Sequence, residues 1–122
     1  MLIEAARRAG VSGYVADGNQ RWPAVHHLDA ARLFRFVLEQ AAPDTVAHAV
    51  ADEGDSMHSI ADTIGRPLGI PTEAVPVESF GFLGTVFAID QPATSTLTRE
   101  RFAWQPTRPS LLDDLEAGRY PA

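Results

Sequence analysis

The sequence predicts an α/β protein, with a small mixed sheet of about four strands and flanking helices. Two observations predict this class. Apolar residues recur at helical spacing in several segments, and short apolar runs bounded by Gly, Pro and Asp lie between them. A length of 122 residues predicts one domain, residues 1–122.

The first two helices are the most regular. One is expected over residues 2–9, with Gly10 as its stop. Because this helix begins directly at Met1 without a cap residue, we expect that the chain begins inside a longer protein. The next helix is expected to begin at Asp29, as N-cap, and to end before Pro43. Its apolar residues are spaced i, i+3, i+4, i+7, i+8 and i+11, which predicts one buried face. They are Ala30, Leu33, Phe34, Val37, Leu38 and Ala41.

Four segments are expected to be strands, and turn signals separate them. The first ends at Asp17-Gly18, a strong turn signal, and the second contains Pro23, which favours an edge position. The third, Thr45–Ala51 (TVAHAVA), is short, apolar and bounded by turns, so we expect a buried strand. The four segments are 11–16, 22–27, 45–51 and 73–77.

The remaining segments predict helices of unequal length. A helix is expected from Ser56 to a stop at Gly69. Phe80–Ile89 (FGFLGTVFAI) is apolar on all sides, so it is expected to be a helix buried on every face or covered by a partner. Ser95 is expected to cap a short helix, and Ser110 with Asp113 resembles a capping box for the last one.

Composition excludes several classes of function. The net charge of -6 argues against nucleic acid or an anionic membrane as partner. There is no cysteine, which excludes disulfides and thiolate chemistry, and all ten basic residues are arginine, which excludes a Tyr-Lys catalytic pair within this chain. No apolar run approaches the roughly 18 residues of a membrane span, and no targeting segment is visible, so the expected location is the cytoplasm.

His26, His27 and Asp29 are the first candidates for chemistry, as a metal site or part of a catalytic triad. Neighbours in a strand point to opposite faces, so the two histidines are not expected to share one ion. The serines occupy cap-like or loop positions, without a G-x-S-x-G elbow. Since Asp29 fits a helix N-cap, we expect no metal site and no triad here.

The loop Asp17–Trp22 is the surviving candidate for a binding site. Arg21 offers a planar fork of donors for an anion, Asn19 and Gln20 add hydrogen bonds, and Trp22 adds a flat apolar wall. A hairpin loop with a surface arginine and a core tryptophan explains the same residues equally well. Both interpretations remain open.

Three segments, in this order and spacing, resemble the extended short-chain dehydrogenases/reductases. They match a Gly turn leading to Arg, Val-His-x-x-Asp and a helix, then a strand–loop–helix unit ending in Leu-Gly, then an Arg-containing helix, Trp-x-Pro and a Leu-rich helix. Together they cover about half the chain and best fit the NAD(P)-dependent epimerase/dehydratase branch. The segments are DGNQRWPAVHHLDAA (17–31), VAHAVADEGDSMHSIADTIGRPLGI (46–70) and TRERFAWQPTRPSLLDDLEAG (98–118).

The resemblance implies the substrate-binding, C-terminal part of such an enzyme. The family's Rossmann glycine motif, catalytic Ser/Thr and Tyr-x-x-x-Lys pair are not in this sequence, so NAD or NADP is implied for the full-length family and no cofactor for this chain. Arg21 matches the family's substrate-contacting arginine and His26 its Val-His position; Asn19 and Trp22 complete the expected substrate site. Trp22-Pro23 replaces the family's usual Asp and aromatic residue, so a smaller or less polar substrate is as consistent with the resemblance as a nucleotide-sugar.

Three functions follow as hypotheses. The first is the substrate-binding half of an NAD(P)-dependent epimerase/dehydratase-like oxidoreductase, not catalytic alone, whose partner is a small-molecule substrate. The second is a stand-alone binding module that self-associates, or docks on a separate Rossmann subunit, through Phe80–Ile89. The third is a His/Asp metal hydrolase.

Overall fold

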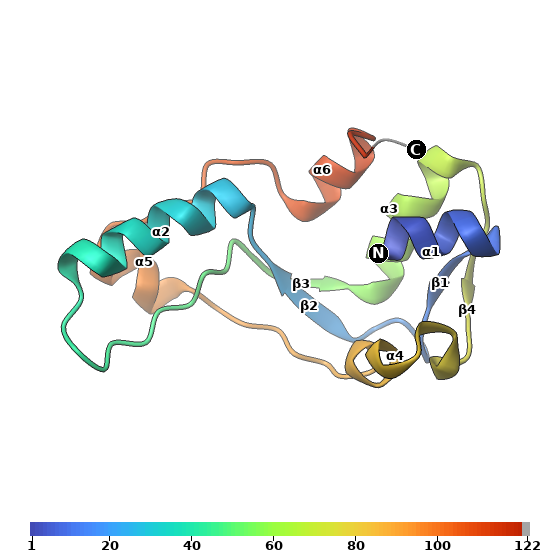
Figure 1. The fold of residues 1–122 in the computed structure, drawn as a ribbon, viewed down its shortest axis with the longest axis horizontal. Coiled ribbons are helices and arrows are strands. Elements are labelled where there is room, and N and C mark those ends of the chain that lie inside the picture. Colours follow the sequence, from blue (N-terminus) through green and yellow to red (C-terminus); the bar gives the residue numbers. More distant parts are fainter. Residues whose placement is uncertain (121–122) are drawn as a thin grey trace.

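A computed structural model describes residues 1–120 (Figure 1). Helices and short strands alternate through most of the described chain, and one 3-10 helix and three α-helices follow the last strand. The α/β class is therefore confirmed. The elements are α1 (Leu2–Ala9), β1 (Ser12–Tyr14), β2 (Arg21–Ala24), α2 (His27–Gln40), β3 (Asp52–Ser56), α3 (Met57–Leu68), β4 (Thr72–Ala74), the 3-10 helix η1 (Val77–Phe80), α4 (Phe82–Phe87), α5 (Thr96–Phe102) and α6 (Leu111–Glu116).

The four strands form two separate two-stranded sheets, so the prediction of one mixed sheet is wrong in its arrangement. β1 and β4 are parallel, with Ser12 opposite Thr72, and α3 lies in the connection between them. β2 and β3 are antiparallel, with Arg21 opposite Ser56, and the register shifts between Trp22 and Ala24. The second pair lies between the two ends of the molecule (Figure 1).

The strand expected at Thr45–Ala51 does not form, and β3 follows it instead. Burial still alternates as in a strand, since Ala47 and Ala49 are half-buried whereas Val46 is 80% exposed. Among residues 1–120, however, no strand pairs with this segment, and its one backbone hydrogen bond to a strand is that of Ala51 to the Ala24 carbonyl of β2. β3 forms at Asp52–Ser56, a sequence of polar residues, because β2 is there to pair with it. The presence of a partner strand, rather than the apolarity of the segment, therefore determined where the strand formed.

Three of the predicted helix ends follow their local sequence signals, whereas Ser95 precedes α5 without a side-chain cap hydrogen bond and donates instead to the Val50 carbonyl. The Ser56 Oγ accepts from the Ser59 backbone N–H at 3.1 Å, and the Ser110 Oγ accepts from that of Asp113 at 3.2 Å. Gly69 closes α3 in the left-handed conformation, with φ of 65°. These three predictions are confirmed, because a cap depends on residues that are adjacent in the sequence.

Two clusters of buried apolar side chains hold the chain together. α3 is the centre of the first core, and Trp104, 1% exposed, is the most buried member of the second. Figure 1 shows α2 and α5 at one end of the molecule and α1, α3 and β1 at the other. The second core includes residues of α2 and α5, and the first includes residues of α1 and α3. The first core contains Ala6, Val15, Met57, Ile60, Ile64, Phe87 and Leu115; the second contains Leu33, Phe102 and Trp104.

Helix α2 buries only part of its predicted apolar stripe. Leu33 is 2% exposed and belongs to the second core. Phe34 and Leu38 are 71% and 88% exposed, so the prediction that they face the core is wrong for this chain. The helix therefore carries a second apolar strip that no described residue covers.

Phe80–Ile89 is not a single helix buried on every face. η1 ends at Phe80 and α4 begins at Phe82, with Gly81 between them at φ 58°. Phe87 is 4% exposed in the first core, whereas Phe82 is 83% exposed. The segment therefore divides its apolar residues between core and surface.

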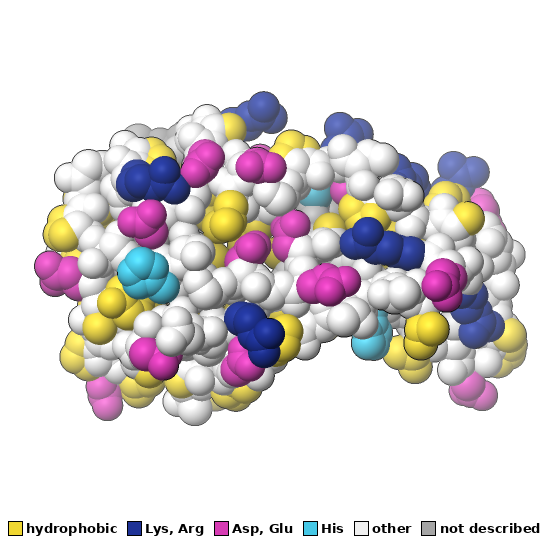
Figure 2. Space-filling model, turned by 180° about the vertical axis from the view of Figure 1, so that it is seen from behind, with side chains coloured by type: hydrophobic (Ala, Val, Ile, Leu, Met, Phe, Trp, Pro, Cys, Tyr) yellow, Lys and Arg dark blue, Asp and Glu magenta, His cyan; other side chains and the backbone are white. Residues whose placement is uncertain are grey.

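The surface carries mixed charge. On the face shown in Figure 2, carboxylate and arginine side chains are interspersed, with apolar side chains between them. Among residues 1–120, none of the helices has the length and apolar character needed to cross a membrane.

Candidate functional site

Two cavities flank β2 and the residues that follow it. The first, here called the apolar cavity, has a volume of about 770 Å³ and is lined by Trp22 and Pro23 together with α1, α3 and α6. The second, the polar cavity, has a volume of about 510 Å³ and includes His26 and His27 in its lining. Leu111 and Tyr120 line both cavities. The predicted substrate segment thus runs from one cavity to the other.

Trp22 forms part of the wall of the apolar cavity. Its ring meets the Phe87 ring edge-on, with 5.3 Å between centroids, and its indole N–H donates to the Ile89 carbonyl at 3.3 Å. The ring plane is thereby fixed from two sides. The alternatives of core residue and cavity wall are both realised, because Trp22 is half-buried against the first core and also lines the cavity.

The polar cavity gathers ionisable side chains from three parts of the chain. Asp52 comes from β3, Asp114 from α6, and Arg119 from the segment after α6. One Asp52 oxygen accepts the Leu111 backbone N–H at 2.8 Å, and the Tyr120 hydroxyl donates to Asp114. Spacing in the sequence gave no signal for this set, because the residues that line the cavity are spread from Ala24 to Tyr120.

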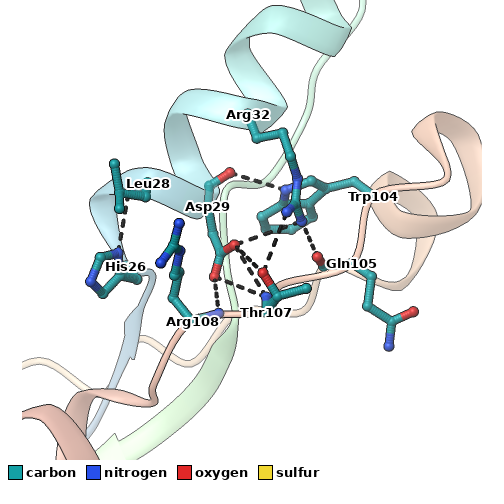
Figure 3. Close-up of polar contacts among 8 residues, drawn as sticks. All are labelled: His26, Leu28, Asp29, Arg32, Trp104, Gln105, Thr107 and Arg108. Atoms are coloured by element: carbon teal, nitrogen blue, oxygen red, sulfur yellow. Dashed lines mark hydrogen bonds and ion pairs between the residues drawn. The ribbon is translucent and has the colours of Figure 1, made fainter.

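His26 and His27 do not lie on opposite faces of a strand. Their rings stack, with centroids 4.5 Å apart and planes inclined by 24°. His26 is the N-cap of α2, where its Nδ1 accepts the Leu28 backbone N–H at 3.2 Å (Figure 3). The strand ends at Ala24, so the alternation that was expected to separate the rings does not apply.

Asp29 is not the helix N-cap that the sequence predicts. It lies inside the first turn of α2, is 1% exposed, and binds the segment after α5 (Figure 3). Its carboxylate accepts the Thr107 backbone N–H at 3.1 Å and that of Arg108 at 2.9 Å, while Arg32 lies 3.6 Å away. The Asp29 carbonyl also accepts the Trp104 indole N–H at 3.0 Å.

These contacts keep Asp29 ionised. Burial opposes the charge, but the backbone N–H groups of Arg108 and Thr107 and the positive charge of Arg32 outweigh it, so the pKa of Asp29 is lowered. Every contact is to the protein itself. Asp29 therefore has a structural role, joining α2 to the C-terminal segment.

Arg21 is already paired. Its Nε and one terminal nitrogen lie 3.1 and 2.9 Å from the two Asp90 carboxylate oxygens, and its backbone N–H donates to Asp90 at 2.7 Å. This bidentate contact raises the pKa of Arg21 and lowers that of Asp90. Arg21 is not among the residues lining either cavity. Its predicted contact with substrate stays a prediction, and it requires the ligand to replace Asp90.

Asn19 and Gln20 both stabilise the loop. The backbone N–H of Asn19 donates to Asp17 at 3.0 Å, and its side-chain amide donates to the same carboxylate at 3.3 Å. Gln20 is buried, and its amide donates to the carbonyls of Val15 at 2.8 Å and Phe87 at 3.0 Å. Of the four predicted site residues, the structure brings Trp22 and His26 to cavities and leaves Asn19 and Arg21 outside them.

Asp55 is a titratable group that the sequence, from the carboxylate cluster Asp52, Glu53 and Asp55, predicted to carry only solvated surface charge. It lies on β3 opposite Trp22, and its Oδ2 is buried with no hydrogen-bond partner among the described residues. Burial and the nearby negative charge of Asp52 raise the pKa of Asp55.

No group of three or more His, Asp or Glu side chains among residues 1–120 is placed to hold a metal ion. The hypothesis of a His/Asp metal hydrolase therefore has no ligand set in the described part of the chain.

Comparisons with known proteins give relatives without an assigned function. No family model matches the sequence. The chain is 43% identical over 124 residues to the uncharacterized protein C2A9.02 of Schizosaccharomyces pombe, covering 98% of this chain and 42% of the relative. It is 41% identical over 121 residues to the uncharacterized protein YLL056C of Saccharomyces cerevisiae, covering 96% and 41% respectively. The chain thus spans about two fifths of the length of these relatives.

Proposed function

We propose that the chain is the substrate-binding portion of an NAD(P)-dependent epimerase/dehydratase-like oxidoreductase and is not catalytic alone. The observation that carries the proposal is the position of residues 22–27. Two of the four residues of the expected substrate site, Trp22 and His26, lie in this segment, and the segment lines both cavities in turn. Cavities of several hundred Å³ with apolar walls and a few polar groups are typical sites for small molecules.

The rest of the enzyme is expected in the part of a longer protein that this chain does not span. The relatives are more than twice as long as the matched region. The parallel pair β1–β4 has only three residues in each strand, and parallel sheets are ordinarily larger and covered on both faces. The dinucleotide and the Tyr-Lys pair would come from that further part.

Calorimetric titration with NADH and NADPH tests the proposal on two proteins, this chain and the full-length S. pombe relative. The relative is expected to bind one of the dinucleotides, and the chain is expected to bind neither. Tight binding of NADH or NADPH by this chain would show that it contains a dinucleotide site, against the proposal. Absence of binding by the relative would remove the oxidoreductase assignment.

A second candidate function is a module that self-associates, or docks on a separate Rossmann subunit, through Phe80–Ile89. The exposure of Phe82, 83%, favours it. Sedimentation velocity over a range of concentrations tests it with Phe82→Ser. The native chain is expected to dimerise and the variant to remain monomeric; a native chain that stays monomeric at all concentrations contradicts self-association.

A further inference from the structure

We infer that the apolar and polar cavities form one composite site for an uncharged amphipathic small molecule, with a ring-sized apolar body and a hydroxyl or carbonyl end. This inference rests on the proposed function and names the substrate class of the same site. Three features support it: the chemistry of each cavity lining, the wall that the two cavities share, and the location of the most exposed apolar side chains outside both cavities.

Most of the apolar cavity's lining is apolar, and the carboxylate in it, Glu4, lies 3.4 Å from the Arg8 guanidinium. The inner wall of this cavity is made of side chains that are 3–8% exposed, among them Met57, Ile60 and Leu115. The indole N–H of Trp22 is already used by Ile89. Arg7, which also lines the cavity, donates to the Tyr120 carbonyl at 3.0 Å. The part of a ligand that enters here gains mainly from burial of apolar surface.

The polar cavity supplies the opposite chemistry. Two carboxylates, Asp52 and Asp114, one guanidinium, Arg119, and the stacked imidazoles of His26 and His27 line it. Acceptors and donors are both present, and the carboxylates outnumber the guanidinium. A phosphate would be repelled by Asp52 and Asp114, whereas a hydroxyl can donate to a carboxylate and accept from a nitrogen. The set therefore favours an uncharged hydrogen-bonding end.

Leu111 and Tyr120 connect the two environments, because each lines both cavities. A molecule that extends from one cavity into the other would place its apolar ring against Trp22 and its hydroxyl or carbonyl group near His26. Trp22 and His26 would then contact the same ligand.

A polypeptide is a poorer occupant of the apolar cavity. Apart from Met1, which is 70% exposed and lines this cavity, the apolar side chains that offer a partner the most exposed area lie elsewhere: Phe34, Leu38 and Phe82 are 71–88% exposed and line neither cavity.

N-phenyl-1-naphthylamine, an uncharged apolar dye whose emission rises on burial, tests the apolar part with the full chain. The native chain is expected to bind it saturably. Leu111→Trp fills the shared wall and is expected to weaken binding at least tenfold, whereas Leu97→Trp, at an 81% exposed position outside both cavities, is expected to bind as the native chain does. Circular dichroism confirms that both variants are folded. Absence of saturable binding, or equal binding by both variants, overturns the inference.

Competition against the bound dye tests the polar end. 2-Naphthol is expected to displace the dye more strongly than naphthalene, and 2-naphthyl phosphate is expected to be the weakest of the three. If the phosphate is the strongest competitor, the assigned substrate class is wrong. These measurements involve no dinucleotide, so their failure is distinct from a failure of NADH or NADPH binding.

Discussion

Asp29 joins two segments nearly 80 residues apart through one carboxylate. Both of its oxygens accept backbone N–H groups, from Thr107 and Arg108, in a site that water scarcely reaches. A buried charge is normally costly, and here the donors around it offset that cost. The same donors would be left without acceptors if the carboxylate were removed.

Asp29→Asn is expected to lower the free energy of unfolding at pH 7 by about 1–3 kcal/mol, because an amide N–H₂ would face the backbone donors. Asp62→Asn removes a half-exposed partner of Arg66 and is the matched control, with an expected change within about 0.5 kcal/mol. Urea unfolding followed by circular dichroism measures both.

The pH dependence of this effect has a defined sign. Because the pKa of folded Asp29 is lowered, its stabilisation is present above the unfolded pKa of about 3.9 and is lost as the pH falls through the folded pKa. The difference between native chain and Asp29→Asn should therefore shrink in acid. A difference that is constant from pH 7 to pH 3 would contradict the role of the charge.

The effect of Asp55 on stability changes with pH in the opposite direction. Its pKa is raised, so its ionisation increasingly opposes folding as the pH rises through the unfolded pKa and then the folded pKa. Asp55→Asn is expected to stabilise the chain by about 1 kcal/mol at pH 7, since a buried oxygen without a partner no longer carries charge. Unfolding at pH 7 and pH 3 measures it, and the gain should vanish at the lower pH. A loss of stability at pH 7 would mean that ionised Asp55 is needed.

The sequence predicted which kinds of side chain would line a site, but not which would be free to bind. Arg21 carries the donor geometry expected of an anion-binding residue, and Asp90, 69 positions later, occupies it. Trp22 was expected either in the core or on a pocket wall, and both descriptions apply. Long-range partners decided these outcomes, and no local pattern specifies them.

Gly84 sets the distance between η1 and α4. A Cβ at this position would lie 1.9 Å from the Val77 carbonyl oxygen, which is backbone and cannot move alone. Gly84→Ala is therefore expected to cost about 1–3 kcal/mol and to shift the α4 segment. Gly69→Ala, at positive φ but with no atom within 4 Å of the new Cβ, is the control and is expected to cost about 1 kcal/mol. Thermal unfolding compares the two; a smaller loss for Gly84→Ala contradicts the close contact.

Most features that depend on neighbours in the sequence were predictable, although the N-cap expected at Asp29 is His26 and Ser95 makes no side-chain cap hydrogen bond. Features that depend on a distant partner were not predictable. The caps at Ser56 and Ser110 and the stop at Gly69 formed as expected. Among the described residues, no strand pairs with the apolar segment Thr45–Ala51, while the polar Asp52–Ser56 has a partner in β2. A strand forms only with a partner strand, so a prediction from apolarity alone placed a strand at Thr45–Ala51 and did not predict the one at Asp52–Ser56.

The two cores share a single C-terminal segment. Trp104 completes the second core, and Leu115 of α6 completes the first. A chain that ends at Ala103 loses both residues and the Asp29 partners, and it is expected to unfold without a cooperative transition. Trp104→Phe keeps most of the apolar volume and is expected to unfold cooperatively at lower urea. Circular dichroism in urea distinguishes these outcomes; a sharp transition in the truncated chain would contradict the shared role.

The arrangement of Trp104 and Leu115 also bears on synthesis. The chain emerges from the ribosome amino end first, and domains generally fold as units during synthesis. Here the second cluster lacks a member until Trp104 has left the exit tunnel, and the first until Leu115 has done so. A stop codon shortly before Trp104 would therefore leave the apolar clusters at both ends of the molecule incomplete at once.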